Sequence, residues 1–221
     1  RRHCLASAAA VSCVSAAPRP DAQTISGKLP WQPLAAVPPC PSLAGWYFFT
    51  PDEVATVEAI VDRLIPPDRL SIGGKEAGCA VFIDRQLAGS FGKSSRLYMK
   101  GPFARGLPTQ GYQGELTPSA RYRDGLRALG DHARAAHGKS FAQLKGSEQD
   151  EILTGLEKGE IDLKLPHGLG SRAFFELVLQ NTMEGFFADP LYGGNKGMAG
   201  WKLVGFPGAR YDYRDHIEKH N

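Results

Sequence analysis

The chain has 221 residues with 26 Lys/Arg and 23 Asp/Glu, and its net charge of +3 is too small to indicate a nucleic-acid-binding protein. Its 42% content of hydrophobic residues is enough for a sizeable core, which favours one domain behind an N-terminal leader. No segment is apolar over the ~20 residues that a membrane-spanning helix needs. Any membrane association is therefore expected through a partner or a surface contact.

The chain begins with the pair Arg1 and Arg2, followed by a weakly apolar, Ala/Ser-rich stretch from Cys4 to Ala17. This pattern resembles a twin-arginine export signal, which directs proteins that are already folded. We expect residues 1–22 to form this signal, with cleavage after Ala17 or Ala22 or with the leader retained. A basic leader without a targeting role is the alternative.

Residues 23–49 contain many prolines, which exclude long helices and central strands. Trp31 and Trp46 lie in this stretch, and Tyr47, Phe48 and Phe49 follow. A free linker has no use for so many aromatic side chains. The sequence therefore predicts an extended arm that packs against its own domain or against a partner.

Four cysteines occur, and Cys4 and Cys13 lie in the leader. Cys40 and Cys79 remain as a candidate disulfide in an oxidising compartment, and such a bridge would stabilise the fold by about 3–4 kcal/mol. The alternative is that Cys79 is a small buried apolar residue. No pair has CxxC spacing, so the cysteines do not indicate a zinc or iron–sulfur site.

The first helix is predicted to begin at Thr50-Pro51-Asp52-Glu53, because Thr50 suits an N-cap, proline suits the first helical position and Glu53 completes a capping box. Apolar residues continue at helical spacing to Ile65, and Pro66-Pro67 ends the helix. A second helix is expected from Glu76 to about Phe91.

Residues 92–116 have the glycine and proline content of a loop. Thr117-Pro118 then opens a helix to about Ala136. The stretch Ser147–Asp150 matches a capping box and opens a helix that ends at Gly159, and Ser171 begins the most apolar helix. No long β-alternation occurs, so the sequence predicts an all-α fold with long irregular connections, forming a single domain over residues 50–221.

Charge is distributed unevenly along the chain. Residues 50–84 hold three Lys/Arg and seven Asp/Glu, residues 85–145 hold eleven and three, and residues 146–221 hold eight and twelve. The net charges of these segments are therefore −4, +8 and −4. Either the basic middle packs against its acidic neighbours, or it forms a face for an acidic subunit or anionic lipid headgroups.

The sequence contains no recognised catalytic or cofactor motif. A G-x-S-x-G elbow, a Walker loop, a dinucleotide-binding G-x-G-x-x-G after a strand and a CxxCH haem site are all missing from it. His216 and His220 have i, i+4 spacing but lack the glutamate of an HExxH motif. We therefore expect no catalytic, cofactor or metal site on this chain.

The stretch 189–213 combines glycines with large aromatic residues. Trp, Tyr and Arg dominate binding hot spots, so aromatic side chains on a glycine-shaped loop suit a protein interface. The alternative is that Trp201, Leu203 and Phe206 complete the core. Together with the two tryptophans of the arm, the interface candidates are Trp31, Trp46, Tyr192, Gly193, Gly194, Trp201, Phe206, Arg210, Tyr211 and Tyr213.

Three segments together resemble the gluconate 2-dehydrogenase subunit 3 family. The first runs from Trp46 to Glu53 and on to Pro66, the second is Gly74–Cys79 with Phe82-Ile83-Asp84, and the third is Asp189–Asn195 with Gly200-Trp201 and Gly205–Gly208. The resemblance covers roughly residues 45–215. The ordered set of motifs is specific, although each motif alone is weak.

This resemblance implies a non-catalytic small (gamma) subunit without a cofactor of its own. Its expected partners are a large FAD-containing dehydrogenase subunit and a multihaem cytochrome c that passes electrons to ubiquinone, and any membrane attachment is expected through them. The complex would lie in the periplasm at the inner membrane of a Gram-negative bacterium. The small subunit would stabilise the flavoprotein and carry the export signal for it.

The substrate stays open between gluconate, 2-ketogluconate, sorbitol and related compounds, because the partner selects it. Two other classes of function are kept as alternatives. A free-standing enzyme predicts turnover by the isolated chain, and a small-molecule- or haem-binding protein predicts a chromophore on it.

Overall fold

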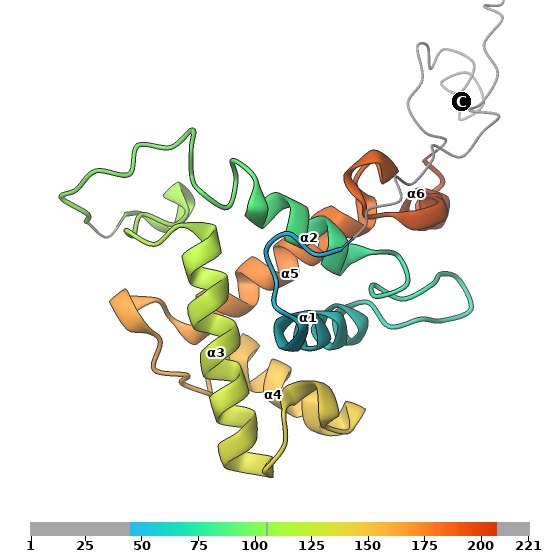
Figure 1. The fold of residues 1–221 in the computed structure, drawn as a ribbon, viewed down its shortest axis with the longest axis horizontal. Coiled ribbons are helices and arrows are strands. Elements are labelled where there is room, and N and C mark those ends of the chain that lie inside the picture. The colour runs from blue at the N-terminus through green and yellow to red at the C-terminus, as the bar shows by residue number, and fades with distance from the viewer. Residues whose placement is uncertain (1–44, 105, 207–221) are drawn as a thin grey trace, which may run out of the picture. The chain divides into compact units, whose positions relative to one another are not determined.

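The computed structural model describes residues 45–104 and 106–206. Six α-helices and several short 3-10 helices alternate there with irregular loops, and no strand occurs among these residues (Figure 1). The predicted all-α fold is therefore confirmed. No helix in this part of the chain is long and apolar enough to cross a bilayer. The predicted leader and most of the predicted arm lie outside it.

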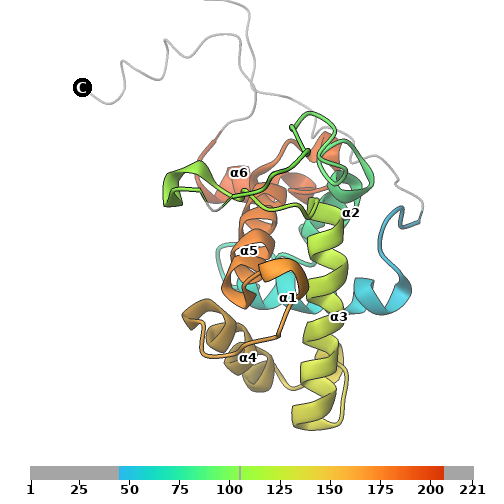
Figure 2. The same ribbon diagram turned by 90° about the vertical axis from the view of Figure 1, so that its left-hand side faces the viewer.

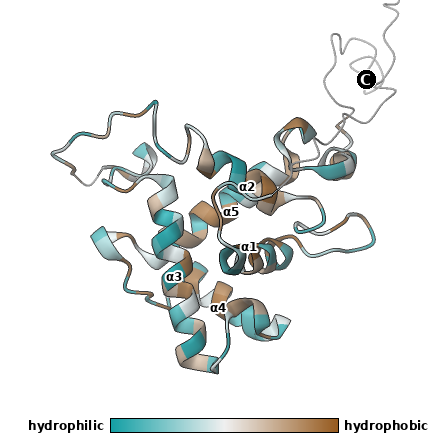
Figure 3. Ribbon diagram, viewed as in Figure 1, coloured by the Kyte–Doolittle hydropathy of each residue, from teal (hydrophilic) through white to brown (hydrophobic). Residues whose placement is uncertain are grey.

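One apolar helix, α5 (Ser171–Phe187), contacts each of the other five α-helices. These are α1 (Pro51–Leu64), α2 (Cys79–Ala88), α3 (Pro118–His137), α4 (Gly146–Lys158) and α6 (Ala199–Leu203). Buried residues lie on several faces of α5, including Phe174, Phe175 and Val178. A stripe of exposed polar residues remains on α5, formed by Arg172, Glu176, Gln180 and Glu184 at four-residue spacing. The rest of the helix is packed into the core. In Figure 3, brown and teal residues alternate along α1 and α3, as expected for amphipathic helices.

Two helices begin at the predicted caps. In α1 the backbone N–H of Thr50 donates to Glu53 at 2.8 Å, and the N–H of Glu53 donates back to the Thr50 hydroxyl at 3.5 Å. In α3 the N–H of Ala120 donates to the Thr117 hydroxyl at 3.3 Å. Gly138 ends α3 in the left-handed conformation, with φ of 70°. Figure 2 shows α3 along one side of the helical body, with α4 near its C-terminal end.

Two other boundaries differ from the sequence prediction. Helix α2 begins at Cys79 rather than Glu76, because Gly78 has a φ of 82° that interrupts the helix. It ends at Ala88 rather than near Phe91, with Gly89 as its C-cap residue. Helix α4 begins before the predicted cap: its N-cap residue is Lys145, whose backbone N–H donates to Glu148 at 2.8 Å. Ser147 therefore lies within the first turn.

The core contains a polar pair at the crossing of α3 and α5. Tyr122 is fully buried, and its hydroxyl accepts a hydrogen bond from Asn181 at 3.1 Å. Burial raises the pKa of the Tyr122 hydroxyl well above its usual value. The helices approach closely at Gly125, since a Cβ there would lie 2.1 Å from the ring of Phe174. This crossing fixes α3 against the central helix.

A long loop joins α2 to α3, as predicted, and includes the short helix η1 (Pro108–Gln110). Its two ends are held together: the N–H of Ser119 donates to the carbonyl of Gly92 at 3.1 Å, and the Ser119 hydroxyl donates to the carbonyl of Leu87 at 2.9 Å. Figure 1 shows this loop extending away from the helices, beyond the C-terminal end of α2 and the N-terminal end of α3.

Candidate partner interface

The segment that follows α5 is organised around one buried asparagine. Asn195 adopts the left-handed conformation, with φ of 47°, and is fully buried. Its amide nitrogen donates to the carbonyl of Ala188, and its amide oxygen accepts from the N–H of Gly200, both at 2.8 Å. Asparagine tolerates this backbone conformation better than most residues do. Asn195 therefore ties the end of α5 to the beginning of α6.

Glycines allow this segment to lie directly against neighbouring backbone. A Cβ at Gly194 would lie 2.1 Å from the carbonyl oxygen of Gly185, and a Cβ at Gly200 would lie 2.1 Å from that of Phe186. The N–H of Lys196 also donates to the carbonyl of Ala77 at 3.0 Å. Gly193 and Gly194, two of the predicted interface residues, are therefore buried parts of the internal structure.

Trp201 is likewise internal. Only 8% of its surface is exposed, and its indole N–H donates to the carbonyl of Phe187 at 2.8 Å. The ring of Phe206 packs against it edge to face, with centroids 5.1 Å apart. For Trp201 the structure supports the alternative interpretation, in which this residue completes the core. We therefore expect substitution of Trp201 to disturb the packing of α6 before it affects a partner.

The same segment exposes several large apolar side chains. Tyr192 is 55% exposed and lies on the short helix η4 (Pro190–Tyr192), which Asp189 caps by accepting from the N–H of Leu191 at 2.9 Å. The exposed residues Phe187, Leu191, Tyr192, Leu203, Val204 and Phe206 are called the C-terminal apolar surface below. They are carried by backbone that the asparagine and glycine contacts hold in place.

The short stretch before α1 is fixed by a buried carboxylate. Asp84 on α2 is fully buried, and it accepts hydrogen bonds from the backbone N–H groups of Tyr47, Phe48 and Phe49, each at 2.9 Å. Arg85 donates to the same carboxylate at 2.8 Å. Three backbone donors and one guanidinium satisfy a buried negative charge. The sequence analysis did not identify this role of Asp84.

Two arginines hold the aromatic side chains of this stretch. Arg85 lies 3.6 Å from the ring centroid of Tyr47 and donates to the carbonyl of Gly45 at 2.8 Å. Arg123 of α3 lies over the ring of Phe48, bonds the carbonyl of Phe48 and pairs with Glu53. The end of the predicted arm thus packs on its own domain. Trp46, an interface candidate, is partly exposed there.

The other candidate residues divide between those in the core and those outside the described ranges. Cys79 is fully buried, and burial raises the pKa of its thiol to about 12, so it is a poor nucleophile. Its pairing with Cys40 stays a prediction, because Cys40 is not among the described residues. The same is true of the roles predicted for Arg1, Arg2, Trp31, Arg210, Tyr211 and Tyr213.

Surface pockets among the described residues include both charged and small or apolar residues in their linings. One, of about 500 Å³, lies between α1 and α3 and has Asp52, Glu53, Arg127 and Arg134 in its lining. Another, of about 390 Å³, includes His132 beside Asp124 and Asp131. Within residues 45–104 and 106–206, no cluster of three or more His, Cys, Asp or Glu side chains could hold a metal ion.

The sequence model of the gluconate 2-dehydrogenase subunit 3 family matches residues 51–208. The chain belongs to this family. The resemblance inferred from the sequence is therefore confirmed, and membership assigns the chain an accessory role as one subunit of a multi-subunit dehydrogenase. No curated protein and no solved structure matches the chain.

The family match runs from the first residue of α1 to just beyond the C-terminal apolar surface. It thus contains Asp84, Asn195 and the close-contact glycines. Among the described residues, the predicted interface candidates with substantial exposure are Tyr192 and Phe206 within the matched range and Trp46 just before it. These three are the candidates that a partner could contact directly.

Proposed function

We propose that the chain is the non-catalytic small subunit of a periplasmic, membrane-associated FAD-dependent dehydrogenase that oxidises a sugar, sugar acid or polyol. In this proposal the flavoprotein subunit binds FAD, and a multihaem cytochrome c passes the electrons to ubiquinone. The small subunit stabilises the flavoprotein and escorts it through twin-arginine export. Family membership supports the accessory role, and the leader motif supports the export step.

The observation that carries the proposal is the C-terminal apolar surface. Six large apolar side chains are exposed within a segment of twenty residues whose backbone is fixed by buried contacts. Exposed apolar side chains on a preorganised support favour binding, because little conformational freedom is lost when the partner docks. We assign this surface to the flavoprotein subunit.

The test replaces Tyr192 by alanine in the intact complex. Truncation of a hot-spot tyrosine weakens binding at least tenfold, so Tyr192→Ala is expected to reduce co-purification of the flavoprotein from detergent-solubilised membranes. Phe206→Ala is expected to act in the same direction. The amount of flavin that co-elutes with the tagged small subunit is the measurement.

The matched control is Tyr98→Ala, which removes an exposed tyrosine from the α2–α3 loop instead. Circular dichroism of each purified variant checks that the helices are retained. Wild-type recovery of flavin with both Tyr192→Ala and Phe206→Ala would contradict the assignment of this surface. Equal loss with Tyr98→Ala would also contradict it.

A further inference from the structure

The basic middle of the chain consists of two parts that differ in their ion pairs. On the helices, Arg85, Arg123, Arg127 and Arg134 each pair with a carboxylate. In the α2–α3 loop, Lys93, Arg96 and Lys100 have no carboxylate partner among the described residues. Arg85 and Arg123 pair with Asp84 and Glu53 of the preceding acidic segment, as the packing explanation expects. Arg127 and Arg134 pair with Asp124 and Asp131 on their own helix instead. The packing explanation therefore accounts for only part of the basic segment and not for the loop.

Residues 93–117 are called the basic loop below. Their sequence holds four basic residues and one acidic residue, Glu115, which contacts His167 at 2.6 Å. The loop also exposes large apolar side chains between its charges: Leu97, Tyr98, Phe103 and Leu107. Tyr98 is 82% exposed, the highest fraction among the exposed large apolar residues. The loop thus presents both cations and apolar groups to its surroundings.

A buried cation lies at the base of the same loop. Arg121 is largely buried, its Nε has no hydrogen-bond partner, and its guanidinium packs 4.1 Å from the ring centroid of Tyr112. Its side chain pairs with no carboxylate within the described ranges, and burial lowers its pKa. One of its terminal nitrogens donates to the carbonyl of Ala173 at 3.4 Å. A buried charge without an anionic partner is costly, and a nearby negative charge reduces that cost.

We propose that the basic loop binds the surface of an anionic lipid bilayer. Arg, Tyr and Phe are also common in protein interfaces, but lysine is depleted there, and two of the three loop cations are lysines. Basic side chains beside Leu and Phe are typical of segments that lie in the membrane interface. The apolar side chains enter the boundary between headgroups and acyl chains, and the three cations contact lipid phosphates. An acidic protein surface is the competing occupant, and the experiment below separates the two.

This contact is independent of the C-terminal apolar surface, since the two sets of residues belong to different segments of the chain. It also differs from membrane attachment through partner subunits, which the family resemblance implies, and it corresponds to the surface contact that the charge distribution left open. The basic loop adds a direct contact from the small subunit itself. If the C-terminal apolar surface binds the flavoprotein while the basic loop binds lipid, the complex has a fixed orientation on the bilayer.

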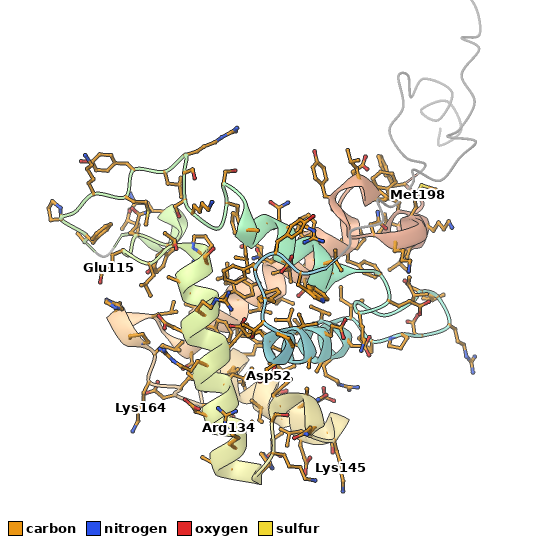
Figure 4. All side chains as sticks on the ribbon, in the orientation of Figure 1. Asp52, Glu115, Arg134, Lys145, Lys164 and Met198 are labelled. Atoms are coloured by element: carbon orange, nitrogen blue, oxygen red, sulfur yellow. The ribbon has the colours of Figure 1, made fainter. Side chains whose placement is uncertain are left out.

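The experiment measures co-sedimentation of the full chain with vesicles of phosphatidylglycerol and phosphatidylcholine, and with vesicles of phosphatidylcholine alone. The test variant combines Lys93→Gln, Arg96→Gln and Lys100→Gln. The control variant combines Lys139→Gln, Lys145→Gln and Lys158→Gln, which removes the same charge from exposed positions elsewhere. In Figure 4, Lys145 lies at the end of the body away from Glu115 of the loop. The leader is present in every variant, so it cannot cause a difference between them.

We expect wild type to bind the anionic vesicles and to dissociate as salt is raised. The loop variant should lose on the order of 100-fold in affinity, since three basic side chains contribute additively at an anionic surface. The control variant should lose much less. Equal binding of loop variant and control, or equal binding of wild type to both kinds of vesicle, would overturn the proposal.

A second measurement tests the apolar contact directly. Tyr98→Trp places a fluorophore in the loop, and brominated lipids should quench the added fluorescence, whereas Lys145→Trp should be quenched little. Absence of quenching at position 98 would overturn the proposal. Release of the flavoprotein by the loop charge variant, with vesicle binding unchanged, would instead assign the loop to an acidic protein partner.

Discussion

A single carboxylate determines where the chain enters the helical domain. Asp84 accepts three backbone N–H groups from residues 47–49, so the direction of the chain before α1 depends on one side chain of α2. Its charge is fully buried and is balanced by Arg85. Removal of such a carboxylate leaves several buried donors and a guanidinium without an acceptor.

Asp84→Ala is expected to lower the free energy of unfolding by about 3–5 kcal/mol, as for other broken buried ion pairs. Urea denaturation followed by circular dichroism measures this loss, and proteolysis between residues 45 and 50 should become faster. Asp84→Asn keeps one oxygen acceptor and should lose less. Asp131→Ala, which removes a carboxylate from an exposed pair, is the control. A similar loss for Asp131→Ala and Asp84→Ala would contradict the role assigned to Asp84.

A second ion pair links stability to pH. Arg63 of α1 binds Asp150 of α4 through two bonds, of 2.7 and 2.6 Å, and this hydrogen bonding holds the pKa of Asp150 below its usual value. Because the pKa is lower in the folded state, the pair stabilises the fold above the unfolded-state pKa near 3.9. That contribution is lost as the pH falls through the folded-state pKa.

Asp150→Asn should therefore be less stable than wild type at pH 7, and the difference should shrink below about pH 4. Both side chains are partly exposed, so screening by solvent limits the effect to at most about 1 kcal/mol. Urea midpoints across this pH range measure it. Glu157→Gln, at an exposed position, is the control. A difference between wild type and Asp150→Asn that grows on acidification would contradict the assignment.

At the scale of elements, the crossing of α3 and α5 depends on the absence of a side chain at Gly125. Gly125 faces the ring of Phe174, whereas Gly130, further along α3, has its nearest neighbours at 3.5 Å on the flexible side chain of Arg134. Both residues lie inside one helix. They therefore form a matched pair in which close packing, rather than helix propensity, differs.

Gly125→Ala is expected to destabilise the domain by about 1–3 kcal/mol through overpacking. Gly130→Ala should stabilise it by roughly 0.5–1 kcal/mol, because alanine favours the helix interior. Urea midpoints of the two variants give opposite shifts if the crossing is as close as described. Shifts of the same sign would show that the α3–α5 contact relaxes easily.

Local signals in the sequence predicted the helices well where a cap and a proline coincide. Thr50 and Thr117 cap the helices that they were predicted to cap, since their bonds form within one turn. The N-cap predicted at Ser147 was wrong by two residues, because the N-cap is Lys145, whose backbone N–H donates to Glu148. Helix α2 was predicted too long at its start, where Gly78 has a positive φ and lies so close to the chain that a Cβ there would be 2.5 Å from the carbonyl oxygen of Gly193. Such a contact far along the sequence leaves no local signal.

The candidate site was harder to predict because burial depends on contacts far apart in the sequence. Aromatic residues on a glycine-rich loop marked the segment as an interface candidate, but they could not separate the buried Trp201 from the exposed Tyr192. The role of Asp84 depends on backbone groups 35 to 37 residues away. No local pattern marks such a residue, because a charged side chain next to Arg85 and Gln86 looks like part of an ordinary exposed face.

At the scale of the whole molecule, the two proposals assign flavoprotein binding and lipid binding to two different surfaces of the subunit. The C-terminal apolar surface is assigned to the flavoprotein, and the basic loop is assigned to lipid. Each set of variants therefore serves as the control for the other: Tyr192→Ala should leave vesicle binding unchanged, and the loop charge variant should leave the recovery of flavin unchanged. Loss of both functions in either set would indicate one shared surface.

The close backbone contacts after α5 have a consequence for large-scale mutagenesis. At Gly194 and Gly200 even one added methyl group would overlap a carbonyl oxygen, so a library of substitutions should score both positions as intolerant in any assay that needs folded protein. Tyr192 should tolerate most replacements when abundance is selected and few when complex assembly is selected. Sensitivity to substitution in this segment therefore identifies its internal framework, and only the difference between the two selections identifies the binding surface.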